Sequence, residues 1–151
     1  MASHVEAAAA GNPNIQLLGE RAPSAVLDLM GRAECLIVPS ECFETFGLVA
    51  AEAFAKGTPV LAADIGGLSE IVSDGENGHL FKPGDPHDLA ENVRVLLADQ
   101  LRLRRMRKLA RTAFEGSFTV EQNHARLMSI YQRVLRRAPS DAEDSRTSLR
   151  V

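Results

Sequence analysis

PSECFETFGLVAAEA, residues 39–53, is the stretch of this 151-residue chain that decides its fold. The apolar run at residues 35–38 predicts a buried strand before it, and the residues after its middle predict a helix that ends at Gly57. This order places Glu44 in the loop that leaves the strand and Glu52 on the helix that follows. In an open α/β sheet, ligands bind beyond the carboxyl ends of the strands, at loops of this kind.

The same stretch has the chemistry of a binding site for a sugar or a nucleotide. The helix start offers free backbone N–H groups and the positive end of the helix dipole, which suit a diphosphate. Gly47 lets the backbone approach a ligand closely, and the carboxylates of Glu44 and Glu52 are good acceptors for hydroxyl groups. Two glutamates eight residues apart are also common as solvated surface acids, so the spacing alone leaves both interpretations open.

Strands and helices alternate along the chain. We expect strands at residues 15–18, 35–38, 60–63 and 79–81. We expect helices from an N-cap at Ser24 to Gly31, from Gly47 to Gly57, from Pro86 to about Leu97, from about Asp99 to Phe114 and from Thr119 onward, with one helical turn at residues 69–72. Asp85 is the expected N-cap before Pro86, and Thr119 forms a capping box with Gln122. This alternation predicts an α/β fold with a mostly parallel sheet flanked by helices.

Length and composition indicate one globular domain that is long enough for a hydrophobic core. Hydrophobic residues make up 45% of the chain and charged residues 25%, which excludes the disordered and membrane-spanning classes. We divide the chain into a poorly structured start at residues 1–13, a binding domain at residues 14–137 and a disordered tail at residues 138–151. The net charge of −3 argues against nucleic acid as an obligate partner.

The expected location is the cytoplasm. The first residues lack the basic and apolar regions of a signal peptide, and no run approaches the ~18 apolar residues that a transmembrane helix needs. Cys35 and Cys42 are predicted to be reduced thiols. No histidine lies close to Cys42 in sequence to activate it, so a nucleophilic role for this thiol is disfavoured.

Several motifs follow one another in order around the opening stretch: Glu44 and Glu52, then Gly57-Thr58-Pro59-Val60, then Gly66-Gly67 before Glu70. In this order and spacing they resemble the signature of the group 1 (family 4) glycosyltransferases, which are retaining enzymes of GT-B fold. A weaker resemblance runs from about Asn14 to Leu135. The chain therefore resembles the latter part of the carboxyl-terminal, donor-binding domain of these enzymes, a partial Rossmann-like domain.

The resemblance implies a role for each residue of the opening stretch. Glu44, the candidate catalytic residue, would hold the hydroxyls of the donor sugar near the reacting carbon, by positioning and electrostatic preorganisation and not by nucleophilic attack. Glu52 would hold the ribose hydroxyls of the nucleotide. The backbone near the diphosphate and sugar would come from Phe46, Gly47, Leu48 and Val49. The reaction implied is transfer of a sugar from a nucleotide sugar to an acceptor, with retention of configuration.

The resemblance also implies no metal and no cofactor other than the nucleotide-sugar co-substrate. The chain has no Asp-x-Asp pair of the kind that metal-dependent transferases place on a diphosphate, and its four histidines lack a ligand spacing. GT-B enzymes use helix ends and basic side chains in place of the ion. Glu70 matches a family position, but an acid at a helix start is equally natural, so both interpretations stay open.

At 151 residues, the chain is shorter than the two-domain pattern of the family. A GT-B enzyme has two Rossmann-like domains with the active site between them, and nothing here matches the acceptor-binding amino-terminal domain or the family's diphosphate-binding Arg and Lys. We therefore expect the isolated chain to be inactive and to need a separate amino-terminal domain or a partner chain. The acceptor is unknown, and the apolar face of the helix after Thr119 is expected to lack its usual partner.

Three interpretations of function stay open. The first is a hexosyl-type retaining glycosyltransferase, represented here by a fragment. The second is a non-catalytic nucleotide-sugar-binding module that needs a separate amino-terminal domain. The third is another GT-B-fold enzyme such as a nucleotide-sugar epimerase, which the Glu44 and Glu52 motif disfavours.

One predicted helix is strongly basic, and its basic residues are Arg102, Arg104, Arg105, Arg107, Lys108 and Arg111. Apolar residues share its opposite face: Leu103, Met106, Ala110 and Ala113. A helix that packs on the core and exposes a solvated basic face is therefore the favoured interpretation. Peripheral contact with an anionic membrane surface is the alternative.

Overall fold

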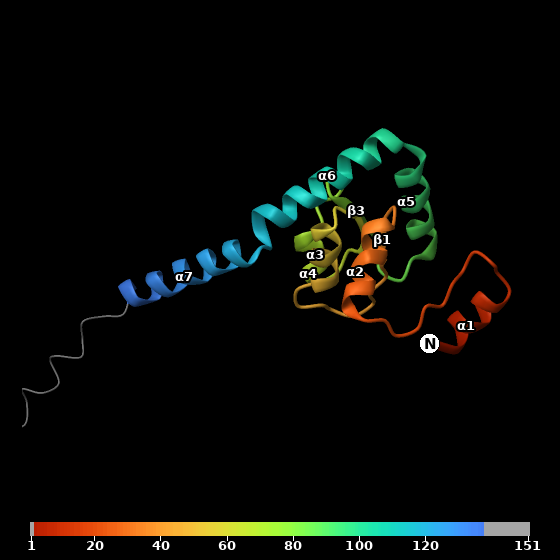
Figure 1. The fold of residues 1–151 in the computed structure, drawn as a ribbon, viewed down its shortest axis with the longest axis horizontal. Helices are drawn as coiled ribbons and strands as arrows, with labels where there is room; N and C mark the ends of the chain where they lie inside the picture. Colours follow the sequence, from red (N-terminus) through yellow and green to blue (C-terminus); the bar gives the residue numbers. More distant parts are fainter. Residues whose placement is uncertain (1, 138–151) are drawn as a thin grey trace, which may run out of the picture.

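The structure, a computed structural model, describes residues 2–137 (Figure 1). The described helices are α1 (Ala2–Ala10), α2 (Pro23–Arg32), α3 (Leu48–Ala55), α4 (Gly67–Ile71), α5 (Pro86–Ala98), α6 (Gln100–Ser117) and α7 (Val120–Arg137). The described strands are β1 (Leu36–Val38), β2 (Val60–Ala63) and β3 (Gly78–Phe81). The predicted tail at residues 138–151 lies outside the described residues.

The three strands form one parallel sheet in the order β1-β2-β3. Leu36 pairs with Val60, and Val60 pairs with Gly78. Parallel neighbours need a crossover between them, and α3 and α4 supply the two crossovers. The predicted α/β class with a parallel, helix-flanked sheet is therefore confirmed.

The central strand β2 divides the core into two clusters. All four of its residues are fully buried, and alternate side chains point to opposite faces of the sheet. Val60 and Ala62 belong to the larger cluster, which includes Phe54 of α3. Leu61 belongs to the smaller one, with residues of α5 and α6. Each large side chain buried in this way contributes about 1.5–3 kcal/mol of transfer free energy.

Local sequence signals set the starts of three helices. Asp85 caps α5, and its carboxylate accepts hydrogen bonds from the backbone N–H groups of His87 and Asp88 at 3.1 Å each. These bonds, led by the one from Asp88, lower the pKa of the Asp85 carboxyl. Asp99 caps α6 in the same way, and the Thr119 hydroxyl accepts from the Gln122 N–H at 3.2 Å at the start of α7.

Two predicted elements near the amino terminus are wrong. Residues 15–18 form no strand, and Leu17 and Leu18 stay 53% and 41% exposed, because β2 is the only strand that pairs with β1 in the described part of the chain. The Ser24 N-cap is also wrong. The N-cap position is Ala22, two residues earlier, and it makes no side-chain cap. Pro23 is the first helical residue, a position that suits its fixed φ and missing N–H.

The expected poorly structured start contains helix α1, in keeping with the high helix propensity of its alanines. Figure 1 shows α1 apart from the rest of the domain, and residues 5–10 are almost all exposed. The division of the chain at residue 13 stays a prediction.

Helix α6 is bound to the ends of two other helices through two of its arginines. Arg107 donates to Ala33 O at 2.6 Å and to Gly31 O at 3.2 Å, at the carboxyl end of α2. Arg111 donates to Ala55 O at the end of α3 and to Glu115 Oε1 at 2.7 Å. Because the last carbonyl groups of a helix lack intrahelical partners, these two cations complete α2 and α3. The helical pattern of the sequence predicted only a solvated face for these two arginines.

Helix α7 leaves the domain and extends away from it (Figure 1). Its apolar face is open, with Leu127 43% and Val134 61% exposed. The expectation that this face lacks its usual partner stays a prediction. None of the helices among residues 2–137 is long and apolar enough to cross a membrane.

Candidate functional site

Two loops meet at the carboxyl edge of the sheet and hold each other in place. The first leaves β1 and carries Glu44, and the second leaves β2 and ends in Gly66-Gly67. The Gly67 N–H donates to Glu44 O at 2.8 Å. A Cβ on Gly66, whose φ is 59°, would lie 2.7 Å from that same oxygen. The Gly-Gly turn is therefore a steric requirement for the position of the Glu44 loop.

Gly47 ends the first loop and begins α3. It takes the left-handed conformation at φ 74°, and a Cβ there would come within 2.8 Å of Leu68 Cδ2. No side chain caps the start of α3. The first N–H groups of a helix have no intrahelical partner, so this end of α3 presents donors at the ligand-binding edge of the sheet.

Glu44 is half-buried and oriented by a neighbour in its own loop. The Ser40 hydroxyl donates to Glu44 Oε1 at 2.5 Å. Among residues 2–137, no other side chain bonds this carboxylate, so one oxygen is held and the other is available.

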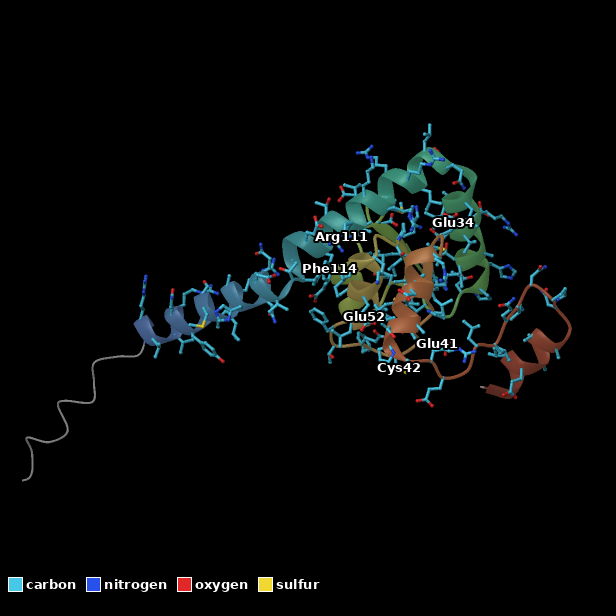
Figure 2. All side chains as sticks on the ribbon, in the orientation of Figure 1. Glu34, Glu41, Cys42, Glu52, Arg111 and Phe114 are labelled. Atoms are coloured by element: carbon cyan, nitrogen blue, oxygen red, sulfur yellow. The ribbon has the colours of Figure 1, made fainter. Side chains whose placement is uncertain are left out.

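Glu52 is exposed on α3, one helical turn beyond Leu48, and lines a hollow of about 540 Å³. The hollow is mainly apolar, and its lining includes Phe46 and Leu48 from the β1–α3 junction and Phe114 and Phe118 from the end of α6. Figure 2 labels Glu52 and Phe114 on the side of the domain from which α7 leaves. A carboxylate beside apolar and aromatic surface suits a ligand with both a ring and hydroxyl groups.

The end of α6 and the start of α7 also contribute to the site, and no motif in the sequence predicted this. The rings of Phe46 and Phe118 meet edge to face with centroids 6.1 Å apart. Arg126 lines the same hollow and donates to Ser117 Oγ at 3.2 Å. No spacing rule connects Phe118 or Arg126 to Glu52, because only the turn between α6 and α7 brings them together.

The predicted residues thus occupy one loop–helix junction, but their side chains point in different directions. Phe46 and Leu48 are exposed at 47% and 68%, whereas Val49 packs against the core. Glu70 is exposed in the first turn of α4 and lines a smaller hollow of about 260 Å³ together with Phe46. This placement leaves both interpretations of Glu70 open.

In the described part of the chain, no group of three or more His, Cys, Asp or Glu side chains could hold a metal ion. Both cysteines are free. Burial, followed by the charge of Glu34, raises the pKa of the Cys35 thiol, which keeps it protonated. Cys42 is exposed in the Glu44 loop.

Comparison with known proteins agrees with this geometry. The model of the family "Glycosyl transferases group 1" matches residues 3–113. The chain belongs to the group 1 glycosyltransferases. The D-inositol 3-phosphate glycosyltransferase of Nocardia farcinica is 44% identical over 110 residues, which are 71% of this chain and 24% of that relative. The chain thus spans about a quarter of the length of this curated relative.

Solved structures show the same GT-B relationship. The Anabaena protein HepE, solved in complex with UDP, is 28% identical with a TM-score of 0.78, over 87% of this chain and 36% of that one. The carboxyl-terminal domain of a group 1 glycosyltransferase from Francisella tularensis has a TM-score of 0.67 at 22% identity, over 79% of this chain and 63% of that one. The second likeness concerns the fold alone.

Proposed function

We propose that this glycosyltransferase domain binds the nucleotide-sugar donor of a retaining sugar-transfer reaction. The observation that carries the proposal is the β1–α3 junction, where the oriented carboxylate of Glu44, the uncapped start of α3 and Glu52 follow one another beyond the carboxyl end of β1. The structures of HepE with UDP and with UDP-glucose support a ligand of this class.

In this proposal each part of the junction has one task. Glu44, held through one oxygen by Ser40, accepts hydrogen bonds from the donor sugar and places negative charge near the carbon that becomes electron-deficient. It orients the sugar and does not attack it. The first N–H groups of α3 bind the diphosphate, and Gly47 allows the close approach. Glu52 accepts the ribose hydroxyls, with the apolar hollow beside it.

Three further parts of the proposal concern what lies outside the described site. The reaction uses no metal ion, because helix N–H groups and basic side chains stabilise the leaving diphosphate. The acceptor-binding surface comes from an amino-terminal domain or a partner chain, and the remaining basic side chains come from the opening part of the donor-binding domain, so the chain by itself is inactive. The proposed location is the cytoplasm.

A second candidate is a non-catalytic nucleotide-sugar-binding module. Both candidates bind the same ligand at the same junction. They differ in whether sugar transfer takes place when an amino-terminal domain is added.

Ligand-observed NMR with UDP-glucose tests the binding proposal. We expect saturation transfer to ribose and glucose protons in the wild type. Glu52→Ala should lose the ribose signals and weaken the Kd roughly tenfold, which corresponds to one hydrogen bond to a charged group. Glu44→Ala should lose the glucose signals and keep the ribose signals. Glu76→Ala, an exposed acid before β3, is the matched control and should bind like the wild type.

Unchanged ribose signals in Glu52→Ala would show that Glu52 does not bind the ribose hydroxyls. An assay of donor hydrolysis and transfer addresses competence separately. We expect no turnover from the chain alone, and robust turnover would contradict its dependence on an amino-terminal domain.

A further inference from the structure

The first turns of α6 present a basic face to solvent. We define this basic face by its four exposed cations, Arg102, Arg104, Arg105 and Lys108, which surround Leu101. At 100° per residue, Leu101, Arg105 and Lys108 fall within one narrow arc of the helix, and Arg104 adjoins it. The opposite arc carries Leu103 and Met106, each 1% exposed, so packing on the core fixes the direction of the basic face.

The cations of the basic face differ from the other arginines of α6. Arg107 and Arg111 bind carbonyl oxygens of α2 and α3, as described above. In the part of the chain that the structure describes, none of the four cations of the basic face forms an ion pair or a side-chain hydrogen bond. Their charge is therefore directed at solvent, on a chain whose net charge is −3.

The acids of α5 and α6 that the structure shows bonded are engaged with groups other than these cations. The Asp99 carboxylate caps α6 and accepts from the Leu101 and Arg102 N–H groups at 2.9 and 3.0 Å. Glu115 pairs with Arg111 at 2.7 Å, and Glu91 pairs with Arg94 at 3.1 Å. One further acid, Glu76, lines a shallow hollow with Arg102 and Arg105. The face therefore keeps a local excess of positive charge.

An apolar side chain lies at the centre of these cations. Leu101 is 78% exposed, and Leu97, at the end of α5, is 41% exposed. A single exposed leucine is ordinary on a protein surface. A leucine surrounded by four unpaired cations at a corner of the fold instead combines the two attractions that hold a protein at an anionic bilayer: charge at the headgroups and a short apolar side chain below them.

The basic face lies at the opposite end of the sheet from the candidate donor site. Arg107 reaches Ala33 just before β1, Arg111 reaches Ala55 before β2, and a Cβ on Gly75 before β3 would lie 3.5 Å from Arg102 Nη2. Helix α6 therefore crosses the amino ends of all three strands, and Figure 1 shows it along an outer edge of the domain. A surface docked there leaves the carboxyl edge of the sheet uncovered.

We propose that the basic face of α6 docks on a membrane surface that contains anionic lipids. Nucleic acid is less well matched, because the centre of the face offers a leucine in place of aromatic or polar groups that read or stack on bases. The proposal depends on α6 alone and does not rest on the proposed glycosyl transfer.

Vesicle co-sedimentation of the chain tests it. Vesicles of equal parts phosphatidylcholine and phosphatidylglycerol should bind the wild type, pure phosphatidylcholine vesicles should not, and added salt should weaken the binding. The triple variant Arg104→Gln, Arg105→Gln, Lys108→Gln should lower partitioning by roughly tenfold or more, since each basic residue near an anionic surface contributes separately. Leu101→Ser should lower it by a smaller factor, roughly threefold.

Two controls separate α6 from the rest of the chain. The variant Arg21→Gln, Arg133→Gln, Arg136→Gln removes the same charge from exposed positions outside α6 and should bind nearly as the wild type does. Leu127→Ser with Val134→Ser alters the open face of α7 and should also bind. Equal binding to neutral vesicles, loss only in the α7 variant, or an unchanged α6 triple variant would each overturn the proposal. Binding to short duplex DNA without binding to anionic vesicles would overturn it in favour of nucleic acid.

Discussion

Helices α3 and α7 differ in how well their amphipathic sequence patterns predict the burial of their apolar side chains. Helix α3 has only eight residues, yet Ala50, Ala53 and Phe54 are fully buried by its neighbours. Helix α7 has 18 residues with a cleaner amphipathic pattern, and Leu127 is still 43% exposed on its apolar face. An amphipathic pattern thus predicts that a face needs a partner, and only the rest of the fold decides whether this chain provides it.

The largest expected effect is a loss of stability when the buried face of α3 is truncated. Phe54→Ala removes a fully buried ring and should lower the free energy of unfolding by about 3–5 kcal/mol. Leu127→Ala on α7 should change it by less than about 0.5 kcal/mol, because that side chain is 43% exposed and belongs to neither core cluster. Urea denaturation followed by circular dichroism measures both. Similar losses for the two variants would mean that α7 packs on the domain in solution.

A smaller effect concerns the contact between the Gly66-Gly67 turn and the Glu44 loop, beside α3. Gly66→Ala would place a Cβ 2.7 Å from Glu44 O at a φ of 59°, and should cost about 2–4 kcal/mol from the clash and the backbone strain together. Gly84→Ala is the matched control, because Gly84 also has a positive φ of 72° but no atom within 4 Å of a Cβ. It should cost only the strain, about 1 kcal/mol. Equal losses in urea unfolding would show that the clash is relieved by movement of the Glu44 loop.

The smallest effect compares the cap of α5 with the cap of α7. Because its pKa is lowered in the folded state, the Asp85 carboxylate contributes stability above its unfolded pKa, and this contribution is lost as the pH falls through the folded value. Asp85→Asn should therefore flatten the acid side of the stability profile measured by urea unfolding between neutral pH and about pH 3.

Thr119→Val removes the hydroxyl that accepts a hydrogen bond from the Gln122 N–H at the start of α7. It should lower helix content by circular dichroism and leave the main unfolding transition unchanged, because α7 extends away from the packed core. A shift of the main transition in Thr119→Val would show that α7 unfolds together with the sheet.

Sequence reasoning succeeded where the deciding signal is local. The strand at residues 60–63 and the capped start of α5 match the structure at every residue, because a proline-entered apolar run and an Asp-Pro pair act within a few residues. The strand predicted at residues 15–18 failed because a strand exists only if a neighbour pairs with it, and no local signal reports that neighbour.

The candidate site divides in the same way. The order of Glu44, Gly47 and Glu52 along the loop and helix was predictable from spacing. The aromatic wall from Phe118 was not predictable, because it depends on how α6 turns into α7 some 70 residues later in the chain. The structural use of Arg107 and Arg111 was missed for the same reason, since the carbonyl groups they bind are far away in sequence.

The contact between Glu44 O and the Gly66-Gly67 turn has a consequence for how this domain can change over time. A side chain cannot be added at Gly66 or Gly67 unless the backbone from Glu44 to Phe46 retreats, because the added atom would meet that backbone at 2.7–3.0 Å. A side chain at Gly66 or Gly67 is therefore tolerated only together with a change in the Glu44 loop, and two residues of the turn constrain the residue that is proposed to hold the sugar. We therefore expect the Gly66-Gly67 turn and the Glu44 loop to change together during evolution.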